Sequence, residues 1–151
     1  MHARVLSFIL TLLVSSFLIP VSAQIYQPEG LNIPGEWNGW TNPPAAGPYL
    51  SSSQAGGLVN LITTGERRWT TTFQSDYTGS RQFLFTSGPN GSPYNNKWGG
   101  VTTALNTIQN YTYQSGTNNS VSVTNGKYYT INWDDNGYVN TNAIVMETSN
   151  A

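Results

Sequence analysis

The sequence contains no cysteine, and its one histidine is His2. Without cysteine a disulfide scaffold is excluded, so the packed core alone must hold the fold together. His2 lies in a segment that has the features of a removable leader. Once that segment is lost, Ser–His and Cys–His catalytic arrangements are excluded as well.

The leader is indicated by three features in a row. Arg4 supplies a positive charge, an apolar run covers residues 5–19, and Val21, Ser22 and Ala23 are the small residues that a signal peptidase reads. The apolar run is shorter than the roughly 20 residues that span a membrane. We therefore predict a signal peptide at residues 1–23, no membrane span, and one secreted or cell-surface domain at residues 24–151.

Charged residues are also scarce, at 9% of the chain. The chain has six Lys and Arg, and removal of Arg4 with the leader leaves five against seven Asp and Glu, a net charge of −2. Nucleic-acid binding needs a clustered basic surface, which this composition does not provide. Nucleic acid is therefore excluded as a partner.

The chain is instead rich in Thr, Asn, Ser, Gly and aromatic residues, and aromatics make up 13% of it. Thr, Tyr, Trp and Val favour strands, whereas Asn, Gly and Pro favour turns. No window of helical length has an apolar stripe, while residues 69–73 and 129–133 alternate as strands do. We predict an all-β fold, an immunoglobulin-like β-sandwich of seven to eight strands, with a small barrel as the alternative. Asn125-Gly126 predicts a type I′ hairpin within it.

The carboxylates give no support for an enzyme. A glycosidase needs two carboxyl groups that flank a groove, and the close pair here, Asp134-Asp135, points to opposite faces of a strand end. A hairpin turn explains this pair best, and a calcium site with Asn136 is the alternative. We expect no catalytic residue, no cofactor and no metal.

Two runs combine aromatic residues with amides and glycines: GEWNGW at residues 35–40 and YNNKW at residues 94–98. A sharp turn cannot bury both indoles of the first run equally well, so we expect one tryptophan in the core and the other partly exposed. Flat aromatic faces suit the apolar faces of sugars, and amides suit their hydroxyls. The competing interpretation is that these rings only pack the core, as aromatic residues do in small domains.

These runs also carry a family resemblance. GEWNGW, WTTTF at residues 69–73, QFLF at residues 82–85 and NKWG at residues 96–99 follow the order of motifs in glycogen- and starch-binding β-sandwich modules. The chain looks most similar to the versions in secreted or surface proteins of Bacteroidetes-type bacteria, including their outer-membrane starch-binding proteins. The resemblance covers residues 31–123, with residues 127–146 as the closing strands.

The resemblance implies a site for an α-glucan-like polysaccharide or oligosaccharide. It implies that Trp40 and Trp98 stack on the sugar and that Asn118 or Asn119 supplies a hydroxyl-binding amide. Leu84 stands where the family has a sugar-binding lysine. Either Lys97 replaces that lysine, or binding has been lost and the scaffold retained.

We therefore expect a non-catalytic carbohydrate-binding module, either alone or as one part of a larger surface protein. Its expected site residues are Trp40, Trp98, Asn38, Tyr94, Asn96, Lys97 and Asn118. The alternative is a structural or adhesion spacer of a surface protein that binds no sugar.

Overall fold

The structure is a computed structural model that describes residues 30–42, 58–63, 68–89, 91–134 and 141–149. In these residues β-strands are joined by turns, and one short 3₁₀ turn, η1, interrupts them. The predicted all-β class is confirmed. The elements are β1 (Leu31–Asn32), η1 (Glu36–Asn38), β2 (Leu58–Thr63), β3 (Arg68–Gln74), β4 (Gly79–Phe83), β5 (Phe85–Ser87), β6 (Asn96–Gly99), β7 (Thr102–Thr103), β8 (Gln109–Asn110), β9 (Thr112–Tyr113), β10 (Asn119–Val123), β11 (Tyr128–Asp134) and β12 (Asn142–Thr148).

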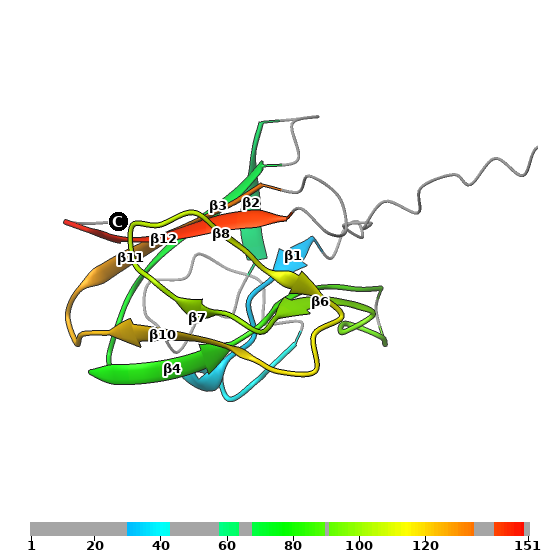
Figure 1. Ribbon diagram of the computed structural model, residues 1–151, viewed down its shortest axis with the longest axis horizontal. Helices are drawn as coiled ribbons and strands as arrows, with labels where there is room; N and C mark the ends of the chain where they lie inside the picture. Colours follow the sequence, from blue (N-terminus) through cyan, green and yellow to red (C-terminus); the bar gives the residue numbers. More distant parts are fainter. Residues whose placement is uncertain (1–29, 43–57, 64–67, 90, 135–140, 150–151) are drawn as a thin grey trace, which may run out of the picture.

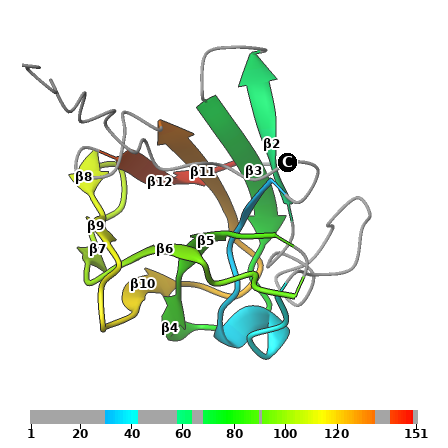
Figure 2. The same cartoon turned by 90° about the vertical axis from the view of Figure 1, so that its right-hand side faces the viewer.

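Nine of these strands form one curled sheet in the order β8-β12-β11-β3-β2-β1-β5-β6-β9. Its two edge strands, β8 and β9, are consecutive in the chain and are separated by Tyr111, whose N–H donates to the carbonyl of Thr141 at 3.1 Å. The segment from β8 to β9 therefore joins the two ends of the sheet, and the strands run around a ring (Figure 2).

A second, three-stranded sheet has the order β4-β10-β7, with β10 antiparallel to β4 and parallel to β7. It lies opposite β3, β11 and β12, so the core is enclosed between two layers (Figure 1). This arrangement is consistent with a β-sandwich, and the immunoglobulin-like variant stays a prediction. The curled nine-stranded sheet also resembles the alternative, a small barrel, because its two edge strands are joined through Tyr111.

The core is aromatic. Buried and half-buried residues alternate along β11, which places Tyr129, Ile131 and Trp133 inside, as the sequence pattern predicts. The ring of Trp133 lies 4.3 Å from Phe85 and 5.1 Å from Trp98, measured between centroids. Large rings in mutual contact bury much apolar area per residue, which suits a small domain without disulfides.

The prediction of a type I′ hairpin at Asn125-Gly126 is wrong. A turn is present, closed by the bond from Lys127 N–H to the Thr124 carbonyl, but only Gly126 has a positive φ, of 81°. The strands on either side, β10 and β11, belong to different sheets. The turn therefore carries the chain from one layer to the other and not into a hairpin.

The link from β3 to β4 crosses between the layers beside this turn. Ser75 connects the two crossings, because its carbonyl accepts from Gly126 N–H at 2.7 Å and its N–H donates to the Lys127 carbonyl at 2.9 Å. The hydroxyl of Thr78 accepts from Asn125 N–H at 2.9 Å. The two layers are thus tied together at this end by paired backbone.

The predicted signal peptide lies outside the described residues, which begin at Gly30. None of the helical structure within the described ranges has the length and apolarity needed to cross a membrane.

Candidate functional site

The turn at residues 35–40 is fixed by hydrogen bonds to Gly35. Its carbonyl accepts from the N–H groups of Asn38 (3.1 Å) and Trp40 (2.9 Å), and its own N–H donates to Asn38 Oδ1 at 3.1 Å. A Cβ on Gly35 would lie 2.6 Å from the carbonyl oxygen of Gln82. Glycine is therefore required for the turn to pack against β4.

The two indoles of this turn have different environments, as predicted. Trp37 is buried against Phe73 and Phe83, and its Nε1–H donates to the carbonyl of Ile33 at 2.9 Å. Trp40 is half-buried and so keeps part of its surface exposed.

Trp40 also has a strained backbone, with φ at +63°. A bulky residue in this region is uncommon, and such strain costs of order 1–3 kcal/mol. The rest of the fold must hold Trp40 in this conformation. Strain of this kind often marks a functional position, which gives Trp40 priority among the candidates.

The structure brings the second aromatic run to the first. Tyr94, which is 38% exposed, donates its phenolic hydrogen to the carbonyl of Trp40 at 3.2 Å. Burial raises the pKa of the Tyr94 phenol above its ordinary value, and the side chain of Asn42 partly opposes that shift. The phenol is therefore a neutral hydrogen-bond donor at neutral pH.

Asn42, which no sequence motif indicates, ties the two runs together. Its Nδ2 donates to Thr86 Oγ1 at 3.0 Å and to the carbonyl of Pro93 at 3.4 Å, next to Tyr94. Because Asn42 precedes a proline, the sequence predicts only a loop residue there.

Lys97 lies on the same outer face, directly across from Thr86 in the β5–β6 ladder. Its side chain is half-buried and makes no ion pair within the described residues. By contrast, Lys127 pairs with Glu147 at 3.3 Å, and Arg81 stacks on the ring of Tyr77. Lys97 thus lies across from the residue that Asn42 contacts, and it has no partner of opposite charge in the part of the chain that the structure describes.

Gln114 is a second residue that the sequence did not indicate. Its φ is +53°, its N–H donates to the carbonyl of Lys97 at 2.7 Å, and its Nε2 donates to the carbonyl of Asn95 at 2.8 Å. It holds the segment that carries Tyr94 and Lys97. In the sequence, Gln114 ends a run that resembles a strand, so nothing there marks it as a residue that fixes a loop.

Trp98 cannot provide a stacking face, contrary to the prediction. Its ring has no exposed surface and packs against Trp133 and Tyr113, at centroid distances of 5.1 and 5.6 Å. The reason is that residues 96–99 form β6, which lies between β5 and β9, and not an open loop.

Asn96 is likewise buried, with 5% of its surface exposed, and its Oδ1 accepts from the Tyr113 hydroxyl at 2.8 Å. The prediction that it contacts a ligand is therefore not compatible with its place in the fold. Its amide supports the sheet instead.

Asn118 is exposed but lies in another polar cluster. Its Nδ2 donates to Gln82 Oε1 at 3.0 Å, and the N–H of Gln82 donates to Glu36 Oε2 at 2.8 Å. None of these contacts joins it to Trp40 or Tyr94. Asn119, the alternative, is fully buried and bonds to the backbone of Trp98 and Val101.

Leu84, at the position of the family lysine, is 8% exposed. Its Cδ2 would lie 2.8 Å from a Cβ placed on Gly99. This position therefore packs into the body and presents no polar group to a ligand.

Of the candidate metal pair, Asp134 ends β11, whereas Asp135 lies outside the described residues. The described residues contain no group of three His, Cys, Asp or Glu side chains close enough to hold a metal ion.

The structure thus joins Asn38, Trp40, Tyr94 and Lys97 with the unpredicted Asn42 and Gln114 along one outer surface, which we call the Trp40 surface. Comparisons of the chain with known proteins give no match to a family model, a curated protein or a solved structure.

Proposed function

We propose that the chain is a non-catalytic carbohydrate-binding module of a secreted or cell-surface protein, with the Trp40 surface as its site. The observation that carries this proposal is the bond from the Tyr94 hydroxyl to the Trp40 carbonyl. It links the aromatic residues of two segments that are 54 positions apart in the sequence.

The chemistry of this surface suits a sugar. The half-buried Trp40 offers an apolar side chain, and the ammonium group of Lys97 offers donors for hydroxyl groups. The Tyr94 oxygen can accept a hydrogen bond, since its own hydrogen goes to the Trp40 carbonyl. Asn38 can donate its second Nδ2 hydrogen, since the first goes to the Thr41 carbonyl. Each such contact in a shallow, wet site is worth about 1 kcal/mol. A single site of this size therefore binds in the range of roughly micromolar to millimolar Kd.

An α-glucan is the ligand class that the family resemblance implies, and it is the ligand we propose. Lys97 takes the role that Leu84 cannot fill, because Leu84 is buried and Lys97 faces outward. Trp98 and Asn96 lie outside the proposed site because they are buried, and Asn118 lies outside it because it bonds to Gln82.

Affinity electrophoresis in gels that contain α-glucan tests the site. Trp40→Gly removes the indole and relaxes the positive φ, so we expect lost retardation with a free energy of unfolding within about 1 kcal/mol of the wild type. Tyr77→Ala is the matched control, because Tyr77 is 41% exposed and lies beside Ser75 at the crossings between the layers. If Trp40→Gly were retarded as strongly as the wild type, the Trp40 surface would not be the binding site.

The alternative, a spacer domain without a ligand, is favoured by one observation. Trp98 and Asn96 are buried, so the exposed aromatic surface is smaller than the sequence indicates. A glycan array with the mature chain separates the two functions, because a spacer gives no signal above that of the Trp40→Gly variant.

A further inference from the structure

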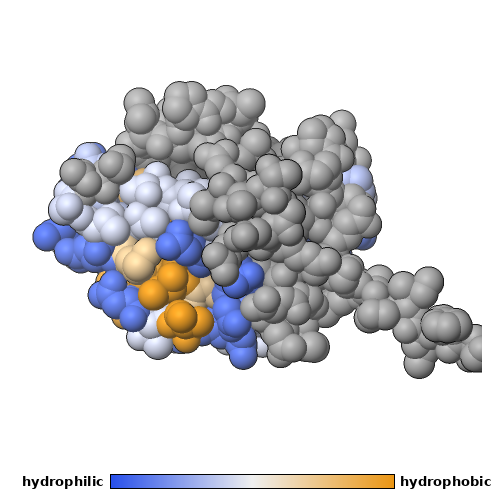
Figure 3. All heavy atoms as spheres, turned by 90° about the horizontal axis from the view of Figure 1, so that it is seen from above, coloured by the Kyte–Doolittle hydropathy of each residue, from blue (hydrophilic) through white to orange (hydrophobic). Residues whose placement is uncertain are grey.

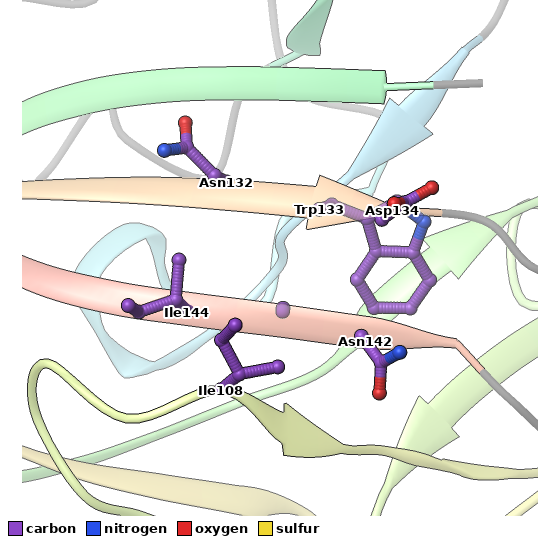
Figure 4. Close-up of a pocket in the computed structure, with 7 residues that line it drawn as sticks. Ile108, Asn132, Trp133, Asp134, Asn142 and Ile144 are labelled. Carbon is purple, nitrogen blue, oxygen red and sulfur yellow. The ribbon is translucent and has the colours of Figure 1, made fainter. Parts of the chain in front are cut away.

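A second surface feature lies away from the Trp40 surface, on the outer side of β11 and β12. It is an open cavity of about 330 Å³, and the described residues that line it are Ile108, Asn132, Trp133, Asp134, Asn142, Ala143 and Ile144. Figure 4 shows Ile108, just before β8, beside β12 and near Ile144. A space-filling view shows an apolar patch bordered by hydrophilic residues on the side where β12 lies (Figure 3).

The apolar part of the cavity is unusually exposed. Ile108 is 69% exposed, the highest value among the large apolar side chains of the described residues, and Ile144 is half-buried beside it. Covering such a side chain removes apolar surface from water, which is favourable. This wall therefore favours a small alkyl group.

The polar part consists mainly of carboxamides. Asn132 Oδ1 accepts from Thr70 Oγ1 at 2.7 Å, which orients the amide and leaves its NH₂ group for a ligand. Asn142 makes no side-chain hydrogen bond within the described ranges, so it offers both a donor and an acceptor. The described part of the cavity thus has more donors and acceptors than the protein itself satisfies.

The strand register places these two parts together. Asn132 lies directly across from Ile144, and Asp134 lies directly across from Asn142. Side chains on directly opposed residues are about 4.5–5.5 Å apart at Cβ. A small ligand that enters the cavity therefore meets an amide and an aliphatic wall at the same time.

We propose that this cavity binds the acetamido group of an N-acetylated sugar. The methyl group packs on Ile108 and Ile144, and the amide of the ligand pairs with Asn142 and Asn132. The volume lies at the low end of ligand pockets, which selects one sugar unit and not a chain. The site is separate from the Trp40 surface and does not depend on it.

Two-dimensional ¹⁵N NMR of the mature chain, titrated with N-acetylglucosamine, tests the proposal. We expect shifts of the backbone and side-chain amides of Asn132 and Asn142 and of the backbone amide of Ile144, and no such shifts with glucose. Ile108→Ser and Asn142→Ala, both changes of exposed or half-buried side chains, should each weaken binding about tenfold. Equal shifts with glucose, or shifts that both variants leave unchanged, would overturn the assignment.

Two further arms distinguish this cavity from a peptide site and from the Trp40 surface. N-acetylglycine methylamide presents the same secondary amide in a peptide, and its tighter binding would overturn the sugar assignment in favour of a peptide ligand. Trp40→Gly should leave the titration with N-acetylglucosamine unchanged. Loss of binding in that variant would show that the sugar occupies the Trp40 surface and that the cavity assignment is wrong.

Discussion

The indole of Trp98 is completely buried and contacts two other rings, so its removal should be costly. Trp98→Ala leaves a large void in a core that disulfides do not support. We expect a loss of about 3–5 kcal/mol in the free energy of unfolding, measured by urea titration. A urea midpoint equal to that of the wild type would contradict the burial of this ring.

Gly99 shows the same dependence on close packing at a single position. A Cβ there would lie 2.2 Å from the carbonyl oxygen of Thr117, and backbone atoms cannot move aside cheaply. Gly99→Ala should therefore destabilise the domain by about 1–3 kcal/mol. Gly116→Ala is the matched control, since nothing lies within 4 Å of a Cβ placed on Gly116, and it should have little effect. Equal thermal midpoints for the two variants would disprove the predicted clash.

Single residues explain what the sequence could and could not reveal about the Trp40 surface. The contrast between Trp37 and Trp40 follows from the sharp turn, which the glycines at positions 35 and 39 indicate. The burial of Trp98 does not follow, because aromatic, amide and glycine neighbours occur both in open loops and in central strands. Only the pairing of β6 with β5 and β9 decides between the two.

Among the connections between strands, the two crossings between the layers depend on Gly126. Its φ is 81°, and nothing lies within 4 Å of a Cβ placed on it, so Gly126→Ala adds backbone strain without a clash. We expect a loss of about 1–2 kcal/mol in the free energy of unfolding. Gly116→Ala again provides the control in the same urea titration. A free energy of unfolding that Gly126→Ala leaves unchanged would show that the crossing tolerates another backbone conformation.

Strand alternation predicts the elements well where both faces differ, as in β11, where Tyr129, Ile131 and Trp133 alternate with half-buried residues. The turn at Asn125-Gly126 can also be recognised from the sequence, but the strands with which its two flanking strands pair cannot. A turn sequence records the local backbone angles and carries no information on which sheet the next strand joins. The hairpin prediction failed for that reason.

For the molecule as a whole, stability should fall at alkaline pH. Burial raises the pKa of Tyr111 above its ordinary value of 10.0, although the bond to Thr103 partly opposes the shift. The unfolded chain then loses the phenolic proton first as pH rises past 10.0, so the stabilising contribution is present below that pH and is lost above it. Tyr111→Phe should make the decline of the urea midpoint above this pH shallower. An unchanged slope would show that Tyr111 does not contribute.

The all-β class follows from composition, because β-branched and aromatic residues dominate and no helical stripe occurs. The closure of the large sheet could not be predicted. It depends on two strands of two residues each, β8 and β9, on either side of Tyr111. Such short strands have no periodicity of their own, and their partners lie in distant parts of the chain.

Carbohydrate binding at the Trp40 surface can be followed through the indole N–H signals of the five tryptophans during NMR titration with a soluble α-glucan. We predict that the Trp40 signal shifts in a saturable way, while the signals of buried Trp37 and Trp98 stay in place. A Trp40 signal that does not move at saturating glucan would contradict carbohydrate binding at this surface.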